Sequence, residues 1–181
     1  MSAPNAAPNP ELSALATAAA NSGPDGAALS RFVERFYARV PQEDLALRTA
    51  DAWLAVARDM LAFAAGRKAG APKLRLLNPE SAPQGFGSSP TVLQIANDDM
   101  PFLVDSVSMA LAERGIGIHL LVHPVIDGES LMHIEIDRQS TDDFAGIEQG
   151  LLAALGDVRL CVQDWSAMRD IMVRAAEDLS T

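Results

Sequence analysis

The segment that most restricts the fold of this chain is 92–125, which packs two apolar strands and a helix into a short stretch. The apolar run 92–96 leads into the acidic loop Asn97-Asp98-Asp99. A helical pattern over 101–114 follows, and Gly115 comes directly after it. The apolar side of this helix consists of Leu103, Val107, Ala110 and Leu111. Alternating apolar residues then predict a second strand, from Ile116, Ile118, Leu120 and Val122. A unit of this kind needs the face of a larger sheet to cover its helix.

The residues after 125 extend this unit to the order strand, helix, strand, strand, helix, strand. Asp127-Gly128 predicts a hairpin turn, and 131–137 alternates as a half-buried strand does. A second amphipathic helix follows over 144–155. A last strand is predicted from the alternating residues Val158, Leu160 and Val162. Asp164 is the expected N-cap of a final helix. This order predicts an α+β fold, a ferredoxin-like βαββαβ sandwich with a four-stranded antiparallel sheet and two helices on one face.

The N-terminal third is expected to be mainly helical, and its helices are expected to pack on this sandwich. Residues 1–24 are expected to be disordered or weakly helical. A strong amphipathic stripe then includes Leu29, Phe32, Val33, Phe36, Tyr37 and Val40. Pro41 ends that helix, and the next helix is expected over about 42–67. Residues 73–77 are a candidate strand.

Composition limits the classes of partner. The chain has 181 residues, 49% of them apolar, which fits one domain or one domain with a helical appendage. Its net charge of −10 disfavours nucleic acid and anionic membranes as partners. From the N-terminal residues no secretion signal is expected, and no segment is long and apolar enough to span a membrane. With Cys161 as the single cysteine, these features are typical of a cytoplasmic protein.

The segment 98–125 resembles an ACT-type ligand-sensing domain. It is more similar still to the N-terminal region of the large bacterial NAD-specific glutamate dehydrogenases. Further similar stretches, in the family's order, are DLALRTADAWLAVARDMLAFAAGRK, LRLLNP, SSPTVLQIANDD, SLMHIEIDR and VQDWSAMR. The resemblance covers about 25–174. It implies a helical segment at 25–78, a loop rich in Pro, Gly and Ser at 79–90, an ACT-like domain at 91–164, and a helix at 165–181 that leads to the rest of a longer protein.

The resemblance also implies a function. The parent enzyme of this family converts L-glutamate and NAD to 2-oxoglutarate and ammonium, in a catalytic domain far downstream. The present chain is therefore expected to be non-catalytic and without a cofactor of its own, and to act as a regulatory or assembly domain. Its expected partners are the downstream domains, other copies in a homo-oligomer, and an amino-acid effector. Two alternatives stay open: a stand-alone amino-acid sensor, and a purely structural oligomerisation module.

Two interpretations apply to the acidic loop. In the first, Asp99 caps the helix that starts at Pro101. In the second, Asp98 binds the ammonium group of an amino acid and the first amides of the helix bind its carboxylate. The resemblance to ACT domains implies a ligand site near this loop and near a glycine that follows the helix. Where the commoner ACT pattern has glycine after the proline, this chain has Phe102, whose ring is a candidate to fill the pocket. The candidate ligand site is Asn97, Asp98, Asp99, Phe102, Gly115 and Gly117.

The three histidines of the chain are a second candidate group. His119 and His123 are four residues apart on a strand and would share a face. A hairpin centred on Gly128 would set His133 opposite His123. Two interpretations stay open, a pair or trio of metal ligands or polar residues on a covered sheet face. No acid or cysteine is spaced to complete a metal site, so no metal is predicted.

Overall fold

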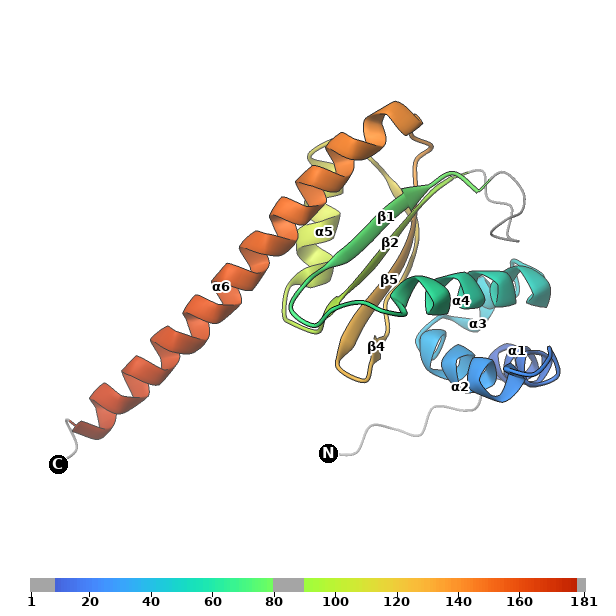
Figure 1. Cartoon of the computed structure of the whole chain (residues 1–181), viewed down its shortest axis with the longest axis horizontal. Coiled ribbons are helices and arrows are strands. Elements are labelled where there is room, and N and C mark those ends of the chain that lie inside the picture. The colour runs from blue at the N-terminus through green and yellow to red at the C-terminus, as the bar shows by residue number, and fades with distance from the viewer. Residues whose placement is uncertain (1–8, 80–89, 179–181) are drawn as a thin grey trace.

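The computed structural model describes residues 9–79 and 90–178, which fold into three layers with an antiparallel sheet in the middle (Figure 1). The strands are β1 (Lys73–Leu77), β2 (Thr91–Asp98), β3 (Ile118–Val122), β4 (Val125–Ile126) and β5 (Glu129–Ile136). The sheet has the order β1-β2-β5-β3, and the short β4 pairs with β5. All these pairings are antiparallel.

One face of the sheet is covered by α5 (Leu103–Ala112) and the first half of α6 (Phe144–Asp178), which follows the short 3-10 turn Thr141–Asp143. Leu93 and Ile95 of β2 point to this side. They pack with side chains of β5 and the two helices, which include Met132, Ile134, Leu111, Leu151 and Leu155. The prediction of an antiparallel sheet with two helices on one face is therefore confirmed.

The other face is covered by the N-terminal helices α1 (Pro10–Ala20), α2 (Gly26–Phe36), α3 (Gln42–Leu45) and α4 (Ala50–Ala64). Val92 and Ala96 alternate with Leu93 and Ile95 along β2 and so point to this side, into a second core. Within this core the Tyr37 hydroxyl donates to the Trp53 carbonyl oxygen at 2.8 Å. The expected packing of N-terminal helices on the sandwich is confirmed.

The predicted last strand is wrong. Val158, Leu160 and Val162 lie inside α6, which runs without interruption from Phe144 to Asp178, so Asp164 caps no helix. Val158 continues a helical row with Leu151 and Leu155, and all three are buried. The fourth main strand comes instead from the candidate at 73–77, because β1 pairs along β2 and occupies that edge of the sheet.

Two smaller differences concern segment ends. The single helix expected at about 42–67 is divided into α3 and α4, because Thr49 caps α4 by accepting a hydrogen bond from the Ala52 amide at 3.3 Å. The hairpin at Asp127-Gly128 is confirmed, with φ angles of 54° and 81°, as a tight turn between two twisted strands requires. Of the predicted loop at 79–90 and the N-terminal stretch 1–24, residues 80–89 and 1–8 lie outside the described residues.

Across the described residues, no helix has the length and apolar content needed to cross a membrane.

Candidate functional site

Asp98, at the end of β2, is held by groups from both helical layers. Its Oδ1 accepts from Arg67 Nη2 at 2.8 Å, and its Oδ2 accepts from Arg159 Nη2 at 3.0 Å and from the Gly70 amide at 2.9 Å. Arg67 follows α4, whereas Arg159 belongs to α6. The carboxylate thus ties the N-terminal helices and α6 to the same end of the sheet.

The same cluster fixes the charge of Asp98. The hydrogen bond from Arg67 is the main reason that the pKa of Asp98 is lowered, and Arg159 and the Gly70 amide lower it further against the opposing effect of burial. Arg67 also donates to Glu129 Oε1 at 2.8 Å, and only 4% of its side chain is exposed. An ammonium group that binds Asp98 would therefore compete with two guanidinium groups.

The rest of the acidic loop does not form the predicted cap. The Asp99 amide donates to the Gly128 carbonyl oxygen at 2.9 Å, which ties the loop to the β4–β5 turn. Helix α5 begins at Leu103, and its N-cap position is Phe102, with a left-handed φ of 68° and no side-chain cap. The prediction that Asp99 caps this helix is therefore wrong. The Phe102 side chain is 68% exposed, so it fills no pocket beneath the loop.

Gly115 and Gly117 lie at the opposite end of α5, whose ten residues span about 15 Å. The Gly117 amide donates to Asp137 Oδ2 at 2.6 Å, and His119 Nε2 lies 2.9 Å from Asp137 Oδ1. These contacts lower the pKa of Asp137, the Gly117 amide most strongly. Of the six predicted site residues, Asn97 and Asp98 come together, since both accept from Arg159, and the two glycines lie elsewhere.

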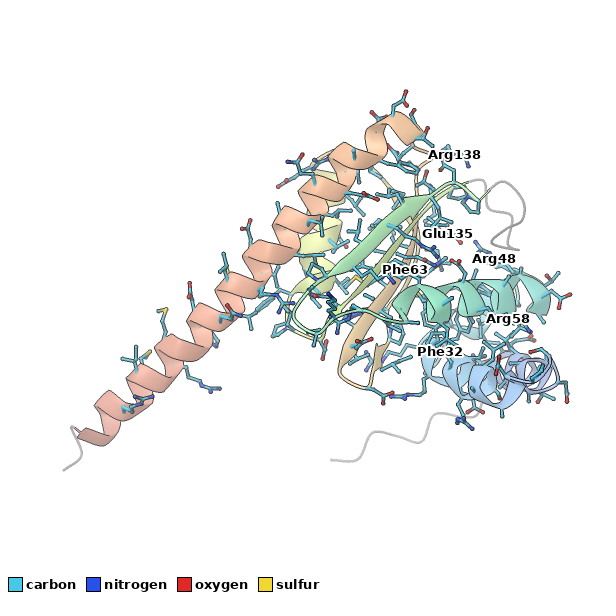
Figure 2. All side chains as sticks on the ribbon, viewed as in Figure 1. Phe32, Arg48, Arg58, Phe63, Glu135 and Arg138 are labelled. Atoms are coloured by element: carbon cyan, nitrogen blue, oxygen red, sulfur yellow. The ribbon has the colours of Figure 1, made fainter. Side chains whose placement is uncertain are left out.

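A row of charged and polar residues lies between the sheet and α4, and the sequence analysis did not predict it. Glu135 of β5 accepts from Arg48 at 2.6 Å through both oxygens, and Figure 2 shows the two side chains meeting between the layers. Further along, Asp59 of α4 accepts from Arg75 at 2.7 Å and from the Gln94 amide at 2.9 Å. The sequence did contain one sign of this row. When helices cover a face of a sheet, the polar residues on that face become buried.

Glu135 is the most strongly perturbed acid in this row. Burial alone would raise its pKa, but the neighbouring His133 and the Arg48 guanidinium outweigh burial and lower the pKa to about 2. His133 Nε2 lies 3.5 Å from Glu135 Oε1, and both side chains are almost fully buried. The carboxylate is therefore ionised inside the protein, and its charge is balanced by the arginine.

The three histidines are not arranged as they would need to be to serve together as metal ligands. A register shift in β3 places Val122, not His123, opposite His133. His123 Nε2 lies 2.7 Å from Ser130 Oγ, and burial is the main cause of its lowered pKa. Within the ranges 9–79 and 90–178, no three His, Cys, Asp or Glu side chains are placed to hold a metal ion.

The outer surface carries a shallow groove of about 410 Å³ between α5 and α6. Its lining residues are Phe102, Ser106, Met109, Ala110, Glu113, Ala154, Asp157, Val158 and Cys161. Most of the exposed groove is apolar, and Phe102 and Met109 are its two large exposed apolar side chains. Such a surface is suited to packing against another apolar surface.

The chain is similar to parts of known proteins. The family model "Glutamate dehydrogenase, ACT1 domain" matches residues 32–128, more than half of the chain. An NAD-specific glutamate dehydrogenase of Halomonas elongata is 34% identical over 177 residues, which cover 84% of this chain and 11% of that protein. One of Pseudomonas aeruginosa is 33% identical over 122 residues, 54% of this chain and 8% of that protein. The chain thus spans only a small part of the length of these relatives.

Proposed function

Because the chain belongs to the glutamate dehydrogenase ACT1 domain family, we propose that it is a domain of a large NAD-dependent glutamate dehydrogenase and serves its assembly or regulation. In that enzyme L-glutamate, NAD and water would give 2-oxoglutarate, ammonium and reduced NAD. The observation that carries the proposal is the match itself, since the relatives are named NAD-specific glutamate dehydrogenases and the matched residues run from α2 to the β4–β5 turn.

The use of charged side chains supports a structural role. The acids Asp59 and Glu135 lie between the layers and Asp98 lies at the end of β2, and each accepts hydrogen bonds from an arginine. A general acid or base needs a pKa near the working pH and access to substrate. The ion pairs instead hold Asp98 and Glu135 ionised, with a lowered pKa in each case. These groups fix the relative positions of the layers.

One observation favours amino-acid sensing as a second function. Asp98 and Arg159 form a partly exposed ion pair at 3.0 Å, with 31% and 25% of their side chains exposed. An amino acid carries the same two charges, so its ammonium could replace Arg159 at Asp98 while its carboxylate binds Arg159. The assembly role needs no such exchange, and we therefore place it first.

The main test compares three proteins in an assay of glutamate-dependent NAD reduction. These are the full-length enzyme that the proposal implies, the same enzyme without the 1–181 region, and the 181-residue chain alone. We expect no turnover by the chain alone. We also expect the deletion to change the oligomeric mass or the response to amino acids. Turnover by the purified chain, or a deletion that leaves mass, kcat, KM and effector response unchanged, would contradict the proposal.

Sensing is tested separately by calorimetric titration of the chain with the common amino acids. Binding that is lost in an Arg159→Gln variant, but kept in a variant of the exposed Arg31, would support the exchange at Asp98. The absence of any binding heat would leave assembly as the function.

A further inference from the structure

A cavity of about 300 Å³ lies between the N-terminal helices and the edge of the sheet that β3 forms. One of its walls consists of the end of α2 and the residues that lead into α3, and the other consists of the second half of β3 and the link to β4. Binding sites for small molecules are common where two parts of a protein meet, and they start at about this volume. The cavity therefore has the size and the position of a site for a small metabolite.

The apolar part of the cavity is built from buried side chains. Phe36, Val40 and Val122 line it, and all three are buried. The Phe36 ring also packs against the rings of Phe32 and Tyr37, with ring centres 5.1 and 4.8 Å apart. Side chains packed in this way keep one position, so the cavity exists before a ligand arrives. A short hydrocarbon chain would displace water from these walls.

Two opposite charges in the cavity have no protein partner. Arg39 and Asp44 both line it. Among the described residues, neither side chain forms a hydrogen bond or an ion pair, with the other or with a third group. Arg35 also lines the cavity but donates to both oxygens of Asp127, at 3.0 and 2.8 Å. Its charge is already balanced, so Arg39 and Asp44 are the charged groups left for a ligand.

His123 adds a hydrogen-bonding group on the opposite wall. Its Nε2 lies 2.7 Å from Oγ of the buried Ser130. When that hydroxyl donates to Nε2, the proton of the neutral imidazole is on Nδ1, which can then donate to a ligand. Burial is the main cause of the lowered pKa of His123, and the charge of Arg39 lowers it further, against the opposing effect of Asp99. The guanidinium of Arg39 is therefore close enough to the imidazole for both to act on one bound group.

We propose that this cavity binds a small carboxylic acid that carries an amino or hydroxyl group beside its carboxylate. The carboxylate binds Arg39 and His123 Nδ1, the amino or hydroxyl group donates to Asp44, and the carbon chain lies on the buried apolar wall. A guanidinium pairs with a carboxylate through two parallel hydrogen bonds. An ionised Asp44 only accepts hydrogen bonds, so it selects a ligand that donates. The site is separate from Asp98 and Arg159, and it does not rest on the function proposed above.

The test is an NMR titration of the 181-residue chain at constant ionic strength, followed through the ring signals of His123. The four probes share one carbon chain: L-norvaline, its hydroxy analogue, valerate, which has neither group, and butylamine, which lacks the carboxylate. We expect the signals to shift with L-norvaline and the hydroxy acid, more weakly with valerate, and not with butylamine. No shift with any probe up to its solubility limit would overturn the proposal.

The protonation of His123 gives a second readout. The charged groups of the cavity and its surroundings are Arg35 with Asp127, Arg39, Asp44 and Asp99. None of these groups normally changes charge near neutral pH, so a bound carboxylate is the only new charge beside the imidazole. The pKa of His123 should therefore rise when L-norvaline is bound.

His119 is the internal control for this readout. It lies at the other end of β3, where its Nε2 is 2.9 Å from Asp137 Oδ1. Its titration should not move when the probe is added. Equal movement of His119 and His123 would show a general effect of the added solute and would contradict binding in the cavity.

Variants assign the two charges. Arg39→Gln should raise the Kd for L-norvaline about tenfold or more, because the carboxylate loses its charged partner. Asp44→Asn should weaken the binding of L-norvaline but not that of valerate, a difference that a general loss of structure would not produce. Arg58→Gln is the matched control, since it removes the same charge from an exposed residue of α4.

The control should bind like the wild type. Because Arg39 and Asp44 have no partner among the described residues, all three variants should keep a thermal midpoint close to that of the wild type. Equal weakening by Arg39→Gln and Arg58→Gln would show only an effect of net charge and would overturn the site. Equal weakening of L-norvaline and valerate by Asp44→Asn would show that Asp44 does not select the donor group.

Discussion

Arg48 donates to both carboxylate oxygens of Glu135, each at 2.6 Å, across a separation of 87 residues in the sequence. The Arg48 guanidinium also lies over the Trp53 ring, 5.0 Å from its centre. Only 2% of the Glu135 side chain is exposed. One arginine between α3 and α4 therefore joins the helical layer to the middle of the sheet, and it balances a charge that would otherwise be buried alone.

This pair makes stability depend on pH in a defined range. The pKa of Glu135 is lowered from 4.5 to about 2 in the folded protein. The ionised carboxylate therefore contributes its full stabilisation above about 4.5. That contribution, about 3 kcal/mol, is lost as the pH falls from about 4.5 through about 2. Urea unfolding of the wild type and of Glu135→Gln at a series of pH values measures it.

We expect the wild type to be more stable than Glu135→Gln at neutral pH, and the difference to shrink across this acidic range. The other acids titrate in both proteins, so the difference between the two curves isolates Glu135. Curves that stay parallel from neutral pH to the acidic limit would show that Glu135 contributes no pH dependence.

The sheet was predictable from sequence because the strands of the 92–137 region carry clear alternation, and the helix between them has one apolar side. The error at 158–162 has a physical origin. Val158 and Val162 are four residues apart, so they fit a helical row with Leu151 and Leu155 as well as a strand. The long-range pairing of β1 with β2 decides between the two, and short-range periodicity does not contain that information.

The site was predicted less well for a related reason. Sequence spacing identified Asp98 as a residue at the end of a strand, but its partners Arg67 and Arg159 lie 31 and 61 residues away. Neither arginine stands in a distinctive local sequence. Only the packing of α4 and α6 around the end of β2 brings them to the carboxylate.

Helix α5 offers a matched test of its buried side. Leu111 is fully buried between the sheet and α6, whereas Met109, two residues earlier, is 63% exposed. Leu111→Ala should lower the free energy of unfolding by about 2–5 kcal/mol through the cavity it leaves. Met109→Ala should change it by less than about 0.5 kcal/mol. Chemical denaturation of both variants checks the assignment, and similar losses in the two would contradict it.

Two glycines should respond to alanine in opposite directions. Gly115 has a φ of 69°, a conformation that alanine adopts only with strain, so Gly115→Ala should cost about 1 kcal/mol. Gly156 lies inside α6, and nothing within 4 Å would touch an added Cβ. Gly156→Ala should therefore stabilise the protein by about 0.5–1 kcal/mol. Thermal unfolding midpoints should move down for the first variant and up for the second.

The last prediction separates the two aspartates of the acidic loop. Asp98→Ala removes one of the two carboxylates around the nearly buried Arg67 and the ion pair with Arg159. It should lower the free energy of unfolding by about 1–3 kcal/mol. Asp99→Ala keeps the amide that donates to Gly128 and leaves α5 unchanged, because the helix is not capped by that side chain. Its effect should stay within about 0.5 kcal/mol.

A double-mutant cycle between Asp98→Ala and Arg67→Ala should show coupling, since the two groups are in contact. Additive losses in that cycle would show that Asp98 and Arg67 do not stabilise each other, and a larger loss at Asp99 than at Asp98 would show that the loop works as a helix cap after all.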